Sequence, residues 1–199
     1  TVLTSKGAQK NKMKNNLVSE AIVLNELKKA LVETLQVDEG VIKPESSFTD
    51  DLGAESLDFL DINYRLEQAF GIKMARHFLL EHIEEMFGEG TAIDDEGRLT
   101  EKAVTLLNLR YGGNMPEIEA GIDMDEVPAM LTVGPFAKGV MDILNTLPEQ
   151  CPQCSSSDWK SEDGMKVSCG SCGESAVYTN GDDLIVAWLT DVQQEKNIF

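Results

Sequence analysis

Ser56 is the residue whose position points most directly to chemistry. It follows an acidic loop that contains Gly53, and it begins an apolar-periodic segment that predicts a helix. The unpaired backbone N–H groups and the dipole at a helix N-terminus favour an anion, so a phosphate ester on this hydroxyl would be stabilised. Serine also caps helices very often. The spacing alone leaves both roles open.

Four cysteines form the second group with a clear chemical interpretation. They occur as two Cys-x-x-Cys pairs separated by residues 155–168, and they are Cys151, Cys154, Cys169 and Cys172. Four thiolates in a tetrahedron satisfy Zn²⁺ with no open position, so we expect a structural zinc site. Free thiols, disulfides and a redox pair fit this spacing less well, and an iron–sulfur cluster stays a second interpretation. With no secretory signal, the thiols predict a reducing, cytoplasmic environment.

Several helices are predicted to position Ser56. An amphipathic helix over residues 17–37 is followed by a loop with Phe48 as its apolar plug, and a second helix over residues 56–70 ends at Gly71. A last helix, capped by Thr132, runs to Leu147. These segments predict a helical bundle.

The motif at residues 51–58 resembles the attachment site of acyl carrier proteins, and the resemblance covers roughly residues 17–72 and 127–148. In that family the serine receives a 4′-phosphopantetheine arm, which here implies modification of Ser56. Two features depart from the family pattern. Glu55 replaces an aspartate, and residues 73–131 form an insertion between the second and last helices.

The resemblance implies a carrier protein and not an enzyme. The arm would hold an acyl or aminoacyl group as a thioester and present it to biosynthetic enzymes of a fatty acid, polyketide, aminoacyl or specialised lipid pathway. The implied partners are a phosphopantetheinyl transferase and acyl-transferring or condensing enzymes with basic docking patches. The acids expected to meet these patches are Glu55, Asp58, Asp61 and Glu67. An ordinary solvated helix face is the alternative for these acids.

Two other classes of function fit the sequence less well than the carrier. An unmodified scaffold or adaptor could use the carrier fold and the cysteine module for protein–protein contacts, and arm transfer in vitro would distinguish it. A serine hydrolase is excluded, because the residues around Ser56 do not form Gly-x-Ser-x-Gly and the chain has only two histidines. His77 and His82 lack a third ligand at metal-binding spacing, so we expect structural or surface roles for them.

The composition limits the partners. The chain has 199 residues and a net charge of −18, from 35 acids against 17 bases. Such a negative potential disfavours nucleic acid and favours basic proteins. No run of 18 apolar residues is present, so no membrane insertion is expected. The lysines near the N-terminus predict a flexible basic tail over residues 1–16.

The predicted fold class is therefore mainly α: a carrier-like bundle over residues 17–148 with a helical insertion, plus a small β zinc ribbon over residues 151–190 and a tail over residues 191–199. The insertion is expected to contain helices over residues 78–87 and 100–109. The ribbon is expected to contain one hairpin turning at residues 163–164 and another at Asn180-Gly181, with strands over residues 176–179 and 184–189.

Overall fold

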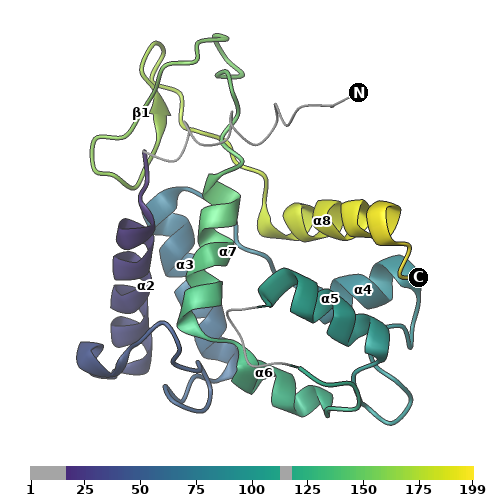
Figure 1. Ribbon diagram of the computed structural model, residues 1–199. Coiled ribbons are helices and arrows are strands. Elements are labelled where there is room, and N and C mark those ends of the chain that lie inside the picture. The colour runs from purple at the N-terminus through teal and green to yellow at the C-terminus, as the bar shows by residue number, and fades with distance from the viewer. Residues whose placement is uncertain (1–16, 113–117) are drawn as a thin grey trace, which may run out of the picture.

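The computed structural model describes residues 17–112 and 118–199 and shows a mainly helical protein (Figure 1). The predicted basic tail over residues 1–16 lies outside the described residues. Three helices form an upright bundle: α2 (Glu20–Leu35), α3 (Ser56–Phe70) and α7 (Val133–Leu144). The short helices η2 (Glu39–Val41), η3 (Met124–Glu126) and α6 (Val127–Met130) lie in the connections. The predicted fold class is confirmed.

The bundle core follows the helical spacing of the apolar residues. Buried side chains at this spacing come from all three helices, and they include Val23, Leu27, Leu31, Ile62, Leu66, Phe70, Val133 and Val140. Ser19 caps α2, because its side chain accepts a hydrogen bond from the backbone N–H of Ile22. The bounds of α3 agree with the prediction, and Gly71 ends it in the left-handed conformation. Thr132 holds the N-cap position of α7, but its buried hydroxyl makes no capping bond.

The insertion builds a second core beside the bundle. Its helices α4 (Leu79–Phe87) and α5 (Glu101–Tyr111) pack together, and Thr100 caps α5, because its hydroxyl accepts a hydrogen bond from the backbone N–H of Ala103 at 3.2 Å. The core residues of this layer are Leu79, Leu80, Ile83, Ala92, Leu99, Ala103, Leu106, Leu107, Ile118, Leu189 and Val192. The last two come from a helix at the far end of the chain. The insertion therefore does not complete its core alone.

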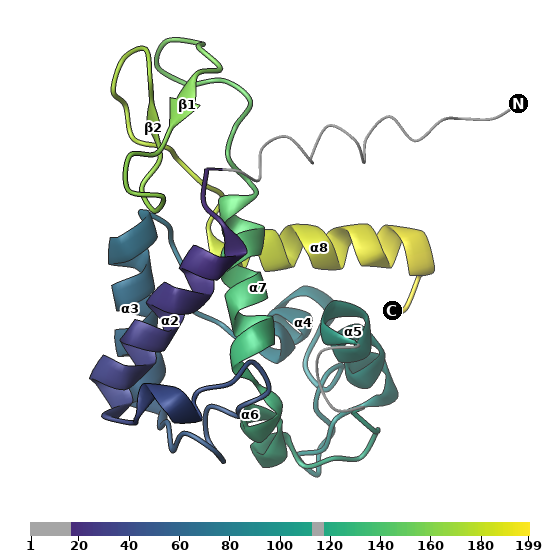
Figure 2. The same cartoon turned by 60° about the vertical axis from the view of Figure 1, so that its left-hand side comes forward.

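That helix corrects the second predicted hairpin. Residues Gly181–Lys196 form α8 instead of a strand, and Asn180 caps it by accepting from the N–H of Asp183 at 2.8 Å. An apolar run as short as residues 184–189 does not distinguish strand from helix by its periodicity, because both elements can bury such a run. α8 extends outward from beside α7 and lies next to α4 and α5, with which it shares the second core (Figure 2).

The end of the chain also differs from the predicted tail over residues 191–199. Residues 191–196 continue α8, and Val192 is buried in the second core. The ring of Phe199 stacks on Phe87 at 4.1 Å between centroids. The predicted ribbon limit at residue 190 therefore falls inside a helix, and α8 belongs with the insertion.

The cysteine module is a small two-stranded unit at one end of the bundle (Figure 2). Strands β1 (Trp159–Lys160) and β2 (Ser168–Cys169) are antiparallel, and Trp159 pairs with Cys169. The first predicted hairpin is thus confirmed, with Gly164 in the loop between the strands. Part of the module packs on the bundle: Val167 and Ala176 are buried in the bundle core, and Trp159 Nε1 donates to the carbonyl of Pro148 at 2.9 Å.

Candidate functional site

The loop before α3 is fixed from below by Phe48. Its side chain is fully buried, and its ring lies 5.2 Å from the ring of Phe59 and 4.9 Å from that of Phe136. Its backbone N–H donates to the carbonyl of Leu131 at 3.1 Å, which ties this loop to the segment before α7. Phe48 is thus the loop anchor that the sequence predicted.

The turn that leads into α3 depends on Gly53. Its φ of 69° lies in the left-handed region that disfavours residues with a Cβ atom. The next residue, Ala54, donates its N–H to the carbonyl of Phe48 at 2.8 Å, which closes the turn on the anchor. The loop geometry therefore determines where α3 begins.

Ser56 is the first residue of α3 and is exposed. Glu55 takes the N-cap position, and its backbone N–H donates to the Asp58 carboxylate at 2.8 Å. Within residues 17–112 and 118–199, the Ser56 hydroxyl has no hydrogen-bond partner. The capping role therefore falls to its neighbours, and the hydroxyl stands at the positive end of the helix dipole.

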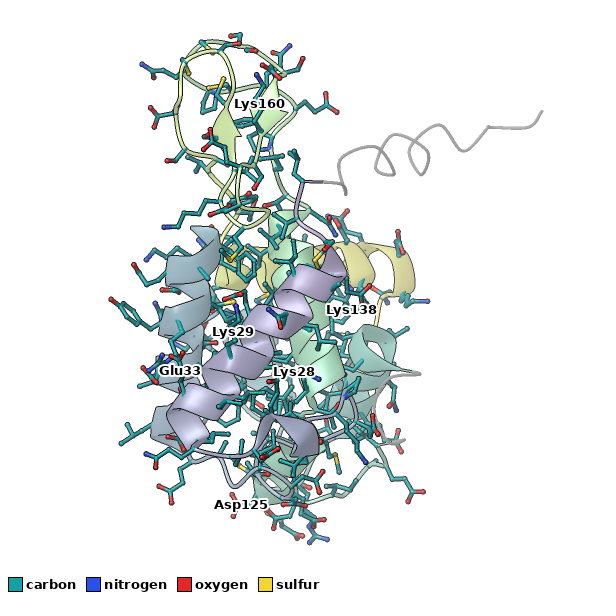
Figure 3. The ribbon with its side chains drawn as sticks, turned by 90° about the vertical axis from the view of Figure 1, so that its left-hand side faces the viewer. Lys28, Lys29, Glu33, Asp125, Lys138 and Lys160 are labelled. Atoms are coloured by element: carbon teal, nitrogen blue, oxygen red, sulfur yellow. The ribbon has the colours of Figure 1, made fainter. Side chains whose placement is uncertain are left out.

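The predicted docking acids differ in how far they reach solvent. Glu55 is exposed, while Asp58 and Asp61 are half-buried. Asp61 accepts from the hydroxyl of Thr34 at 2.6 Å and from Arg65 Nε at 2.8 Å, and these bonds, the one to Thr34 foremost, lower the pKa of its carboxyl. Arg65 also pairs with Glu33 of α2, which lies beside α3 (Figure 3). Asp61 thus joins two helices and keeps part of its carboxylate exposed.

Glu67 is not on this surface, which corrects its predicted docking role. Only 4% of the residue is exposed. Its carboxylate accepts from the backbone N–H of Met74 at 2.9 Å and from Arg76 Nη2 at 2.9 and 3.1 Å, and Lys73 Nζ lies at 3.6 Å. The segment that follows Gly71 covers this side of α3, and the spacing of residues within the helix does not predict that contact. Glu67 is a structural residue that fixes the start of the insertion.

Three large apolar side chains on α3 face solvent. Leu57, Leu60 and Tyr64 are 77%, 55% and 57% exposed. Their spacing puts them on one face of the helix, next to Asp58 and Asp61. Sequence reasoning missed this group, because the helical spacing of apolar residues identifies the buried face of α3 and not the exposed one. An exposed apolar cluster bordered by acids is typical of a protein-binding surface.

A cavity of about 210 Å³ lies between the bundle and the insertion. Ser56, Phe59 and Leu60 line it from α3, and other aromatic walls come from Phe78, Tyr111 and Phe136. α8 adds Leu184 and Ile185. The lining is mostly apolar, and the residue at its edge on α3 is the predicted attachment serine. The insertion and α8 therefore create a space beside Ser56 that a bundle alone would not have.

The four cysteines converge on one point. Their sulfur atoms all lie within 4.8 Å of one another, with Cys151 and Cys172 3.7 Å apart and Cys154 and Cys169 3.6 Å apart. A disulfide needs about 2.0 Å between sulfurs. Four Zn–S bonds of about 2.3 Å in a tetrahedron place the sulfurs about 3.8 Å apart. Backbone N–H groups, that of Cys172 foremost, lower the pKa of the Cys169 thiol to about 6. The backbone N–H of Glu174 lowers the pKa of the Cys172 thiol, but hydrogen bonds with Cys154 and Cys151 and burial outweigh it and raise that pKa to about 12. The donor set and spacing fit a metal ion.

The structure also gives the two histidines a third companion. Asp182, in the first turn of α8, accepts from the backbone N–H groups of Arg76 at 3.0 Å and His77 at 3.1 Å and contacts His82 Nε2 at 3.0 Å. Burial would raise the pKa of the Asp182 carboxyl, but these hydrogen bonds lower it. Sequence reasoning missed Asp182, because that position was predicted to lie in the second hairpin of the ribbon.

Comparison with known proteins identifies the family that the region around Ser56 resembles. Residues 25–84 match the family model described as PP-binding, a phosphopantetheine attachment site. The match begins within α2, includes the whole of α3 and its loop, and ends within α4. The N-terminal part of the chain is therefore similar to a phosphopantetheine-attachment domain. The cysteine module and most of the insertion lie outside the match.

Individual relatives are acyl carrier proteins. The chain is 52% identical over 44 residues to acyl carrier protein AcpXL of Brucella melitensis biotype 1 and of Brucella suis biovar 1, which covers 22% of this chain and 47% of each relative. The same identity and length relate it to acyl carrier protein AcpXL of Rhizobium meliloti, with 46% of that protein covered. The chain thus spans about half the length of these curated relatives. No solved structure matches it.

The described helices bear on the membrane prediction as well. Among residues 17–112 and 118–199, none of the helices combines the length and the apolar character needed to cross a bilayer. The cytoplasmic location expected from the thiols stays a prediction.

Proposed function

We propose that Ser56 carries a 4′-phosphopantetheine arm and that the protein presents an acyl or aminoacyl group on that arm. The observation that carries this proposal is the exposed hydroxyl at the first position of α3, inside the part of the chain that matches the attachment family. A phosphodiester there is favoured by the helix dipole and the first N–H groups of α3.

The proposed activity is presentation and not catalysis. A thioester at the end of the arm keeps its carbonyl electrophilic, and it acidifies the neighbouring carbon. Client enzymes can therefore condense, reduce or transfer the group while the carrier supplies only its position. The cavity beside Ser56 is suited to cover an apolar part of the arm or its cargo, because aromatic side chains such as Phe59 and Phe136 form its walls.

The proposed docking surface is the outer face of α3 after Ser56. It combines the acids Glu55, Asp58 and Asp61 with the exposed apolar side chains described above. Its partners are the phosphopantetheinyl transferase and the acyl-transferring or condensing enzymes, which meet it with basic patches. Each exposed ion pair contributes about 1 kcal/mol or less, so the apolar side chains supply much of the contact.

We further propose that the cysteine module is a zinc ribbon. Cys151, Cys154, Cys169 and Cys172 would hold one Zn²⁺ with no open position, so the ion has a structural role. The module is small, and some of its apolar side chains, such as Val167 and Ala176, pack in the bundle core and not in a core of the module itself. A metal that stabilises the fold is expected for a unit of this size.

Arm transfer in vitro tests the carrier proposal. The apo protein is incubated with coenzyme A and a broad-specificity transferase, and the intact mass is measured for the parent, Ser56→Ala and Ser157→Ala. Ser157 is an exposed serine of the cysteine module and serves as the matched control. The parent and the control should each gain one arm, and Ser56→Ala should gain none. Labelling of all three, or of none, would contradict the proposal, and the second result would favour the unmodified scaffold.

A further inference from the structure

We propose that His77, His82 and Asp182 form a second metal site, which takes a divalent transition metal such as Zn²⁺. The three residues meet where the first turn of α8 contacts the segment that leads into α4. This site is separate from the four cysteines, and it does not depend on modification of Ser56.

The ligand atoms already have the separation that a metal requires. One atom of each residue lies within 4.8 Å of the other two. Asp182 Oδ1 is 3.0 Å from His82 Nε2 and 3.8 Å from His77 Nδ1. Ligands about 2.0 Å from a tetrahedral zinc stand about 3.3 Å apart, which lies between these two distances. Small side-chain rotations would complete the site.

The second imidazole distinguishes a metal site from a simple hydrogen-bonded contact. His82 and Asp182 alone would form an ordinary buried hydrogen bond, in which the carboxylate satisfies the polar ring nitrogen of a buried histidine. His77 adds a ring nitrogen, Nδ1, that lies 3.8 Å from the same oxygen and so beyond hydrogen-bond range, and its ring is set edge-to-face at 5.7 Å from that of His82. A shared ion accounts for the convergence of both rings on one carboxylate.

The surroundings of Asp182 hold it in place for this role. The backbone N–H groups of Arg76 and His77 donate to its carboxylate, and such outer hydrogen bonds orient metal-binding carboxylates. The helix also begins at a fixed distance from the chain opposite. The N–H of Gly181 donates to the carbonyl of Lys73 at 2.9 Å, and a Cβ at position 181 would lie 2.3 Å from the nitrogen of Ala75. Only glycine permits this approach.

The ligand set indicates the class of metal. Two imidazoles and one carboxylate suit zinc and its neighbours in the transition series, whereas magnesium and calcium prefer oxygen ligands alone. Three protein ligands leave one position for water or a small ligand. The side chain of His77 is about half exposed, at 52%, so an ion can enter from solvent. Since His77 and Gly181 also line the cavity beside Ser56, a bound ion would hold α8 against that cavity.

Cobalt distinguishes the two sites in the intact chain. Thiolate ligands give Co²⁺ strong charge-transfer absorption in the near ultraviolet, whereas a site of nitrogen and oxygen ligands gives only weaker visible bands. Protein freed of metal with a chelator under reducing conditions is titrated with Co²⁺. We expect one equivalent with thiolate absorption and a second equivalent without it.

Two variants decide the assignment. His77→Ala removes a half-exposed ligand and should weaken the second equivalent roughly 100-fold or more, because even outer-shell changes cost 10–100-fold. Asp183→Asn changes the neighbouring acid of the same helix turn, which lies outside the cluster and pairs with Asn180, and it should bind like the parent. Circular dichroism checks that both variants fold. No second equivalent in the parent, or equal binding by both variants, would overturn the proposal.

Discussion

Replacement of Glu67 by alanine distinguishes a structural role of its carboxylate from a role in docking partners. If its carboxylate contacted partners, replacing it with alanine would alter arm transfer or client binding and leave stability nearly unchanged. In the structure the side chain is buried and joins the end of α3 to Met74 and Arg76 at the start of the insertion. Glu67→Ala should therefore destabilise the protein.

The magnitude follows from the two groups that lose their partner. The N–H of Met74 would lose a charged acceptor in a buried position, which costs about 1.5–3 kcal/mol. Arg76 is 48% exposed, so water takes over much of its solvation and its lost pair adds about 1 kcal/mol or less. The sum is about 2–4 kcal/mol. Gln at position 67 can still accept from Met74, so Glu67→Gln should lose only about half of that.

Urea unfolding followed by circular dichroism measures this loss. With an m-value of about 2 kcal/mol/M, Glu67→Ala should lower the midpoint by about 1–2 M. Asp61→Asn is the matched comparison, since it changes a half-exposed acid of the same helix and should shift the midpoint by far less. Equal midpoints for Glu67→Ala and the parent, together with weaker partner binding, would refute the structural role and restore the docking interpretation.

Two further predictions concern the ends of the molecule. Removal of metal by a strong chelator under reducing conditions, or Cys169→Ser, should unfold the cysteine module and leave α2, α3 and α7 protected in hydrogen exchange; retained protection of residues 151–176 without metal would contradict it. Leu189→Ala removes a fully buried side chain of the second core, so it should lower the free energy of unfolding by about 2–5 kcal/mol. Hydrogen exchange should become faster in α8, α4 and α5 and stay unchanged in α2. Uniform changes in exchange across the chain would contradict the division into two cores.

The part of the site that the sequence predicted is the part specified locally. Ser56 begins α3 as expected because the signals are neighbours: a glycine turn before it, a cap at Glu55 and Gly71 at the other end. Phe48 is predictable as an anchor, because it is the only aromatic residue in the otherwise polar loop over residues 44–51. The cysteine spacing likewise placed four sulfurs together without any knowledge of distant contacts.

The failures have a common physical origin in contacts between distant segments. The apolar run at residues 184–189 is compatible with a strand or a helix. It packs on the apolar face of α4 and α5, and the sequence around the run does not predict that contact. Glu67 carries the same signature as an exposed acid of a helix, and only the path of the chain after Gly71 covers it. Asp182 meets His82 across one hundred positions of sequence, so spacing rules could not find it.

The cysteine module acquires a further role from its position between α7 and α8. Thr179 donates its N–H to the hydroxyl of Thr146, so the chain enters and leaves the module at nearly the same place on the bundle. With the module folded, α8 starts beside Lys73 and Ala75 and needs no search to reach the second core. With it unfolded, residues 145–180 become a flexible loop whose closure costs on the order of 3 kcal/mol. That free-energy cost is comparable to the stabilisation from one buried leucine. Loss of metal should therefore loosen α8 and the cavity wall beside Ser56, although the metal contacts no residue of either.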